Sequence, residues 1–217
     1  MPQLFFPASN TLREADSQKE VQATINKIPI SIEAYLSRCK EGLIESRSGE
    51  VKRQFKPHGV VAVFGAFNFP AHLPNGHIIP AILAGNTVVF KPSEYTPMTG
   101  ALYTKLLVEV LPQGVLCMVQ GGATVGKEIV ANKTINGVYF TGSSETGKSI
   151  QTQLLDRSRV ILALEMGGNN PLVVHSVSNI DAVVYTIIQS AFLSSGQRCS
   201  CARRLILTPE SPQELIL

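Results

Sequence analysis

Three groups that could do chemistry lie between Gly142 and Cys199. The run GSSETGKS, from Gly142 to Ser149, is a glycine-bracketed loop that could begin a helix and hold a phosphate. Glu165 ends the apolar run VILALE before two glycines, so we expect it to be partly buried and to act as a base. Cys199 follows Arg198, whose charge favours a thiolate nucleophile. A nucleophile, a base and an anion site together indicate covalent chemistry on a nucleotide-linked substrate.

The loop Gly142–Ser149 also matches the phosphate-loop pattern G-x-x-x-x-G-K-[ST], between an apolar strand and a helix. The match permits three interpretations. The loop could belong to a nucleotide hydrolase, it could be an ordinary solvated helix start, or it could bind the phosphates of a dinucleotide at a helix amino end. Against the hydrolase, no apolar run ends in an aspartate that could hold magnesium, because VILALE ends in glutamate.

Asn68 and Lys91 are further candidates at the ends of apolar strands. Asn68 lies in FGAFNFP, where it is either a turn residue or an amide donor for a developing oxyanion. Lys91 precedes Glu94 in FKPSE, and this pair is either a solvated strand end or a grip on ribose hydroxyls. The four histidines are scattered, and a C-x-C pair of Cys199 and Cys201 would need further ligands, so we predict no metal site.

The composition excludes several classes of function. The chain has 217 residues, of which 44% are hydrophobic and 16% charged, as in globular proteins. No apolar run approaches the ~18 residues of a membrane span, and the amino end is a poor signal peptide. The net charge of +3 is spread out, so we expect no nucleic-acid partner and no membrane partner. Four unevenly spaced cysteines argue against a disulfide framework and for the reducing cytoplasm.

An alternation of strands and helices from Gly59 onward must position these residues. We predict short strands, apolar on both faces as in parallel sheets, at 59–65, 86–92, 114–121, 137–142 and 160–165. We predict helices between them at 76–84, 96–111, 126–131 and 145–155. Thr96 is the expected cap of one helix, and Gly85 the expected left-handed end of another. This order is typical of an α/β fold with a doubly wound parallel sheet.

The pattern divides the chain into three parts. Residues 1–20 are polar with little periodicity, and we expect a loose amino-terminal segment. Residues 21–164 begin with a helix and form the domain of the doubly wound sheet. Residues 165–217 begin a second α/β domain, with a strand NPLVVH, a helix capped by Ser178 and Asp181, a strand RRLILT and a helix start PQELIL.

Five segments in this order point to a family. FNFP, AGNTVVFKPSE, FTGSSETGK, LEMGGNNP and SGQRC resemble motifs of the NAD(P)-dependent aldehyde dehydrogenase superfamily. The resemblance implies that Cys199 attacks an aldehyde and that Asn68, with the Cys199 backbone N–H, holds the oxyanion. It implies further that Glu165 activates the water that hydrolyses a thioester. The first domain would bind the dinucleotide, and the second would carry the catalytic thiol.

The resemblance also implies a cofactor site. Lys91, Ser93 and Glu94 resemble the residues that hold the adenosine ribose. The cofactor phosphates would lie against Gly122, Gly126 and the loop residues Gly142, Ser143, Ser144, Glu145, Thr146 and Gly147. Lys148 would then be an ordinary helix residue. Because the Glu94 carboxylate would repel a 2′-phosphate, we predict NAD rather than NADP as the cofactor.

Finally, the resemblance implies a substrate class. HLPNGHIIPAILAGN and GQRCSCARRL are similar to segments of family members that oxidise N-succinylglutamate 5-semialdehyde in arginine catabolism. Another semialdehyde, of the glutamate-semialdehyde type, is the alternative within the family, and the phosphate-loop hydrolase is the alternative outside it. Family members are more than twice as long as this chain and are expected to be homo-oligomers. We therefore expect a truncated chain without activity of its own.

Overall fold

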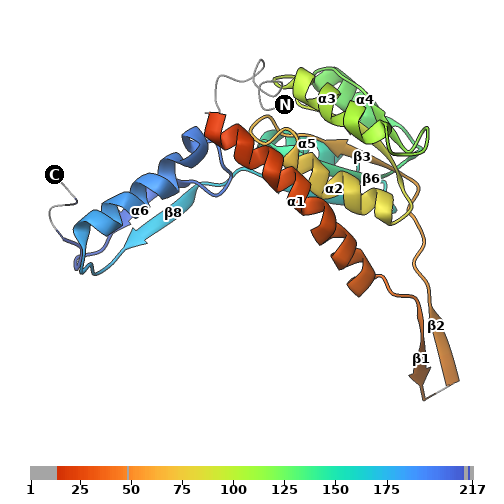
Figure 1. The fold of residues 1–217 in the computed structure, drawn as a ribbon, viewed down its shortest axis with the longest axis horizontal. Helices are drawn as coiled ribbons and strands as arrows, with labels where there is room; N and C mark the ends of the chain where they lie inside the picture. Colours follow the sequence, from red (N-terminus) through yellow and green to blue (C-terminus); the bar gives the residue numbers. More distant parts are fainter. Residues whose placement is uncertain (1–13, 48, 213–214, 216–217) are drawn as a thin grey trace.

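The computed structural model describes residues 14–47, 49–212 and 215, and Figure 1 shows their arrangement. A central parallel sheet contains β3 (Val60–Phe64), β4 (Thr87–Lys91), β5 (Leu116–Met118), β6 (Ile135–Gly142) and β7 (Ile161–Met166). These strands lie in the order β5-β4-β3-β6-β7. The α/β fold with a doubly wound parallel sheet is therefore confirmed, and each predicted strand overlaps an observed one.

The strands are apolar on both faces because helices cover each side of the sheet. Along β3, Val61 and Val63 face one core, whereas Ala62 and Phe64 face the other. The first core is covered by α2 (His72–Leu83) and α3 (Pro97–Val108), and the second by α4 (Ala123–Ala131) and α5 (Ser144–Gln153). These two layers of helices fix the directions of the strands, and hence the positions of the residues at their ends.

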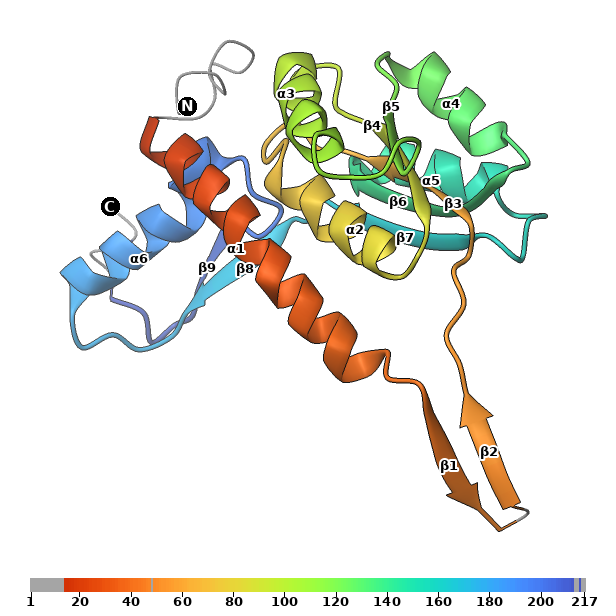
Figure 2. The same ribbon diagram turned by 45° about the vertical axis from the view of Figure 1, so that its right-hand side comes forward.

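Helix α1 (Glu14–Arg38) packs against α2 on the outer side of the first layer, as Figure 2 shows. Residues 14–20 are helical, so the loose segment predicted for this part of the chain is wrong; residues 1–13 lie outside the described residues. The helix begins early because the buried side chain of Glu20 accepts hydrogen bonds from the amino end of α2 and is anchored there. Pro29 lies within α1 without ending it.

Two smaller sheets lie outside the central one. Strands β1 (Gly42–Ser46) and β2 (Gly49–Arg53) form an antiparallel hairpin that projects from the body of the molecule (Figures 1 and 2). Strands β8 (Asn170–Val174) and β9 (Ala202–Leu207) form a parallel pair, joined by α6 (Ile180–Phe192) and the 3₁₀ turn η2 (Leu193–Gly196). This β8–α6–β9 unit matches the strand, helix and strand predicted after Glu165. Most of the helix start expected at 212–217 lies outside the described residues.

The helix ends differ in detail from the sequence predictions. The cap of α6 is Asn179, whose side chain accepts a hydrogen bond from the N–H of Ala182, so the prediction of Ser178 is wrong. Asn and Ser are equally good caps, and a sequence pattern does not separate neighbours. Thr96 occupies the cap position of α3, but its side chain makes no capping hydrogen bond. Gly85 has a φ of +82°, which confirms the predicted left-handed conformation.

Candidate active site

A cavity of about 1000 Å³ lies at the carboxyl ends of the central strands. The register of the sheet brings these ends together, since Phe64 lies opposite Lys91 in β4 and opposite Phe140 in β6. The strand order reverses between β3 and β6, which is where doubly wound sheets bind ligands. Glu165 of β7 and Cys199 of the β8–α6–β9 unit line the same cavity. Residues from both parts of the chain therefore meet around one space.

Cys199 lies on a tight turn between η2 and β9, and several hydrogen bonds hold this turn. Asn170, at the start of β8, donates from Nδ2 to the carbonyl oxygens of Cys199, at 2.6 Å, and of Cys201, at 3.1 Å. The guanidinium of Arg203 donates to the carbonyl oxygen of Gly196 at 2.6 Å. The Cys199 side chain itself is exposed. The turn is thus fixed through its backbone, while the sulfur remains accessible to a ligand in the cavity.

Asn68 follows β3 and contacts the same turn. Its Nδ2 donates to the carbonyl oxygen of Gln197, and its Oδ1 accepts from the N–H of Phe69 at 3.1 Å. This long-range contact brings the predicted oxyanion donor beside the segment that carries the predicted nucleophile. An amide nitrogen has two hydrogens, so Asn68 can contact Gln197 and donate to an oxyanion at the same time.

Glu165 lines the cavity near the end of β7. Its side chain is exposed, so the expectation that it is partly buried is wrong. The reason is topological: β7 is an edge strand of the central sheet, and Gly167 and Gly168, which follow it, have no side chains to cover the carboxylate. A carboxylate in this position can accept a proton from water that enters the cavity.

Lys91, Ser93 and Glu94 line the cavity where β4 ends. Lys91 is buried, and its Nζ lies 3.5 Å from Oε2 of Glu94 and 3.2 Å from the carbonyl oxygen of Pro92. Ser93 is buried as well, whereas 49% of the Glu94 side chain is exposed. The ammonium group therefore orients a carboxylate that can accept hydrogen bonds from a hydroxyl-bearing ligand.

The amino ends of α4 and α5 form another wall of the cavity. The residues of the predicted phosphate wall that line the cavity are Gly122, Gly126, Gly142, Ser143, Glu145 and Thr146. Helix amino ends favour phosphates because they present free N–H groups and a partial positive charge. A Cβ at Gly122 would meet no protein atom within 4 Å, so the space beside this glycine can receive a ligand. These features fit the phosphates of a dinucleotide.

Two other residues of the predicted phosphate wall, Ser144 and Gly147, are not among those that line the cavity. A Cβ at Gly147 would clash with Sδ of Met166, so this glycine allows α5 to pack closely on β7. The phosphate-loop hydrolase is not supported, because β6 ends at Gly142 and α5 begins at Ser144. Only Ser143 is left as a loop residue, whereas a phosphate loop surrounds its ligand with a longer run.

Sequence patterns did not indicate Glu20, which anchors the helix that follows Asn68. Its Oε1 accepts hydrogen bonds from the N–H groups of Ala71, at 2.9 Å, and His72, at 3.3 Å. Burial raises the pKa of Glu20 to about 7, and the two backbone hydrogen bonds oppose this shift. A contact between a polar helix residue and a distant helix end has no signature in a single sequence, so no pattern could have found it.

His77 is a second group near the site that sequence patterns did not single out. It lies on α2, lines the cavity and stacks on Tyr139 of β6, with ring centroids 5.4 Å apart. Burial lowers the pKa of His77, the charge of Glu165 opposes this shift, and Lys27 adds to it. His77 thus adds an imidazole to the titratable groups around Glu165.

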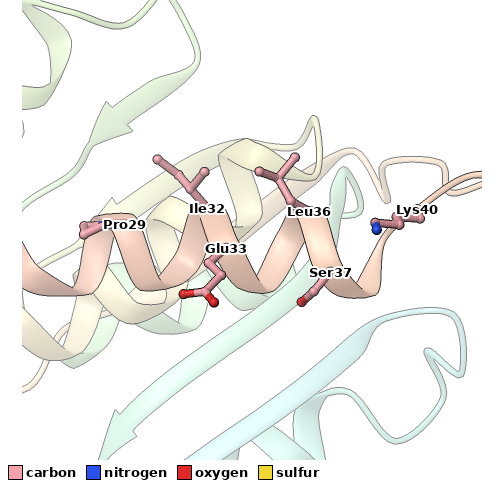
Figure 3. Close-up of a pocket in the computed structure, with 6 residues that line it drawn as sticks. All are labelled: Pro29, Ile32, Glu33, Leu36, Ser37 and Lys40. Carbon is pink, nitrogen blue, oxygen red and sulfur yellow. The ribbon is translucent and has the colours of Figure 1, made fainter.

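A second, smaller hollow of about 420 Å³ lies on α1 (Figure 3). In Figure 3, Ile32 and Leu36 extend from one side of the helix, and Glu33 and Ser37 extend from the other. None of the residues predicted to be functional lines this hollow. We therefore take the cavity at the strand ends as the candidate active site.

Within the described part of the chain, no helix has the length and apolar character that crossing a membrane requires. A profile of the aldehyde dehydrogenase family matches residues 8–216. The N-succinylglutamate 5-semialdehyde dehydrogenase of Pseudomonas fluorescens (strain Pf0-1) is 55% identical over 196 residues, which cover 90% of this chain and 40% of that protein. The chain thus spans about 40% of the length of the curated relatives that it matches.

Solved structures have the same fold. An NADP-dependent enzyme of E. coli matches with a TM-score of 0.88 and 29% identity, over 96% of this chain and 44% of that one. An NAD-dependent benzaldehyde dehydrogenase from Corynebacterium glutamicum matches with a TM-score of 0.85 and 28% identity, over 96% and 46% of the two chains. The similar structures therefore include enzymes described with each of the two nicotinamide cofactors.

Proposed function

Because this chain belongs to the aldehyde dehydrogenase family, we propose that it supplies the cofactor site and the nucleophile for oxidising an aldehyde to a carboxylate. The observation that carries the proposal is the meeting of Cys199, Asn68 and Glu165 around one cavity. Residues 21–164 would bind the cofactor, and residues 165–217 would present the thiol. We infer a cytoplasmic enzyme, since its thiols are free.

In the proposed reaction, the sulfur of Cys199 forms a bond to the aldehyde carbon, and the carbonyl electron pair moves to oxygen. The amide of Asn68 and the backbone N–H of Cys199 hold this oxyanion. A bound nicotinamide would supply a hydride acceptor, which leaves a thioester on the sulfur. Glu165 then takes a proton from water, the water oxygen attacks the thioester carbon, and the carboxylate product leaves as the thiolate is restored.

We propose NAD as the cofactor. Lys91, Ser93 and Glu94 would contact the adenosine ribose, and the amino ends of α4 and α5 would contact the phosphates. The choice of NAD rests on Glu94, whose carboxylate can accept hydrogen bonds from ribose hydroxyls and would repel a 2′-phosphate.

For the substrate we propose N-succinylglutamate 5-semialdehyde, because relatives with this substrate in their names are 53–55% identical to the chain. A semialdehyde of the glutamate-semialdehyde type is the competing substrate. The comparison of kcat/KM for the two compounds, each with NAD, decides between them. A higher kcat/KM for the second compound would overturn this part of the proposal.

Substitutions in the enzyme that carries this sequence test the mechanism. Cys199→Ala should reduce NADH formation to background, whereas Cys117→Ala, which removes an exposed thiol outside the cavity, should not. Glu165→Gln should keep a first burst of NADH but slow steady turnover by about 10²–10⁴-fold, because only thioester hydrolysis needs the base. Turnover that survives Cys199→Ala would refute the proposed function.

A further inference from the structure

Arg198 is a cation in the cavity beside the nucleophile, and two contacts hold its guanidinium. Its Nε donates to Oγ of Ser194 at 2.9 Å. Its Cζ lies 5.4 Å from the ring centroid of Phe69, a cation–π contact with the residue that follows Asn68. The guanidinium is therefore fixed between the turn that carries Cys199 and the loop that carries Asn68.

Ser194 holds the guanidinium in spite of a strained backbone. It has a φ of 53° and is 3% exposed, and Ser195 beside it has a φ of 55°. Left-handed conformations of residues other than glycine cost on the order of 1 kcal/mol or more, and they persist where surrounding contacts impose them. The turn thus places the Ser194 hydroxyl against Arg198 even though the backbone at Ser194 and Ser195 is strained.

The charge of Arg198 has no acidic partner among the described residues. The ion pairs found there join Lys91 to Glu94 and His175 to Glu210. Within the described part of the chain, Nε is the one Arg198 nitrogen that makes a hydrogen bond. The two terminal nitrogens can therefore donate to a ligand. A guanidinium that is held in place but not neutralised is suited to a carboxylate, which it can bind with two parallel hydrogen bonds.

The cavity carries charges of both signs, so an anionic ligand needs a cation close to the place where it binds. Glu94, Glu145 and Glu165 line the cavity and would repel a substrate carboxylate. Lys91 is already paired with Glu94. Lys27 of α1, Lys127 of α4 and Arg203 of β9 also line the cavity, and the guanidinium of Arg203 donates to the carbonyl oxygen of Gly196. Among the cations of the cavity, Arg198 is the one that directly precedes Cys199 in the chain.

We propose that Arg198 binds a carboxylate of the aldehyde substrate and thereby selects acidic semialdehydes over neutral aldehydes. The inference rests on the proposed function, because it assumes that Cys199 is the nucleophile. Arg198 neighbours Cys199 in the chain, so a carboxylate a few bonds from the aldehyde carbon can reach the guanidinium while the sulfur attacks. N-succinylglutamate 5-semialdehyde has two carboxylates, and its α-carboxylate is the one that lies within a few bonds of the aldehyde carbon.

Alkylation of Cys199 by two small reagents tests the proposal without turnover. Iodoacetate carries a carboxylate and iodoacetamide is its neutral analogue, and both react with the thiolate. The ratio of their rates, measured by mass mapping of the Cys199 peptide, is therefore independent of the fraction of thiolate. Arg198→Gln should lower the iodoacetate-to-iodoacetamide ratio by about 10-fold or more, because hydrogen bonds to charged groups contribute about that much. Arg198→Lys should restore part of the ratio.

Two control variants make the same change of net charge elsewhere. Arg159→Gln removes an exposed guanidinium outside the cavity, and Lys27→Gln removes a cation of α1 that lines the cavity. Both should leave the ratio within about 2-fold of the wild type, because salt screens the effect of charges that do not contact the reagent. An unchanged ratio in Arg198→Gln, or an equal decrease in Lys27→Gln, would overturn the proposal.

Kinetics separates this inference from the proposed function. In the enzyme that carries this sequence, Arg198→Gln should lower kcat/KM for the acidic semialdehyde by about 10–100-fold, mainly through KM, and leave butanal oxidation within a few-fold. Equal losses for both aldehydes would refute the selection by Arg198. If neither aldehyde is oxidised by the wild type, the proposed function fails, while the alkylation ratio still decides whether Arg198 recognises a carboxylate.

Discussion

The central sheet and the β8–α6–β9 unit are both parallel α/β arrangements, yet they bury their apolar side chains to different degrees. In the central sheet, Val61, Val63 and Phe90 are 0% exposed. In the β8–α6–β9 unit, α6 has no buried residue, and Phe192 is 68% exposed. The first region has helices on both faces, whereas α6 packs on β9 along one side and leaves Tyr185, Ile188 and Phe192 exposed.

This difference shows that the two walls of the cavity are held by different forces. The strand ends that carry Lys91 and Asn68 are fixed by a packed core. The turn that carries Cys199 is fixed by hydrogen bonds from Asn170 and Arg203 and by its contact with Asn68. Each such bond contributes only about 0.5–1.5 kcal/mol to stability, but its direction is specific. The nucleophile is thus positioned by polar contacts where the apolar packing is incomplete.

The largest expected effect compares one phenylalanine from each region. Phe90→Ala should reduce the free energy of unfolding by about 3–5 kcal/mol, because it removes a fully buried ring and leaves a cavity. Phe192→Ala should change it by less than about 0.5 kcal/mol, since its ring is already mostly in water. Urea unfolding of the two variants measures both values. Similar decreases in the free energy of unfolding would show that α6 is buried in solution. The two regions would then not differ in how they bury apolar side chains.

The second prediction concerns Glu20, which joins the packed region to the loop of Asn68. Burial raises the pKa of Glu20 from 4.5 to about 7, so between these pH values the folded protein keeps a proton that the unfolded chain has released. Stability should therefore fall as pH rises through this window, by about 3 kcal/mol in total. Glu20→Gln should remove most of this dependence.

The matched control is Glu33→Gln, which changes an exposed carboxylate on the same helix. It should keep the pH dependence of the wild type in thermal unfolding at a series of pH values. The expectation fails if Glu20→Gln and the wild type lose stability equally between pH 4.5 and 7.

These two regions also differ in what a sequence can predict. The strands of the central sheet follow from local apolar runs, and their ends place Lys91, Glu94 and Glu165 at one edge, as parallel strands require. The exposure of Glu165 was mispredicted because sequence patterns do not show which strand lies at the edge. The early start of α1 was missed because the contact of Glu20 joins residues far apart in the chain. The hydrogen bonds of Asn170 could not be predicted from the sequence either, because they depend on how the β8–α6–β9 unit folds back.

The smallest effect on stability is expected at Glu94, within the packed region but on its exposed rim. Glu94→Gln should change the free energy of unfolding by about 1 kcal/mol or less, because the carboxylate is half exposed and buried Lys91 keeps its contact with the carbonyl of Pro92. The substitution should affect the relative affinity for NAD and NADP more than it affects the free energy of unfolding. The wild type should bind NAD more tightly than NADP, and Glu94→Gln should narrow this difference by removing the charge that repels the 2′-phosphate.

Calorimetric titration of the protein with each cofactor measures the two dissociation constants and hence their ratio. Glu145→Gln is the matched control, because Glu145 lines the same cavity at the amino end of α5. Removal of that carboxylate should strengthen the binding of both cofactors, since both carry the pyrophosphate, and should leave their ratio nearly unchanged. If Glu145→Gln shifts the ratio as much as Glu94→Gln, the preference reflects the overall charge of the cavity rather than a contact at the ribose. Tighter binding of NADP by the wild type would exclude Glu94 as the residue that selects the cofactor. The packed sheet would then position the Glu94 carboxylate without determining which cofactor binds.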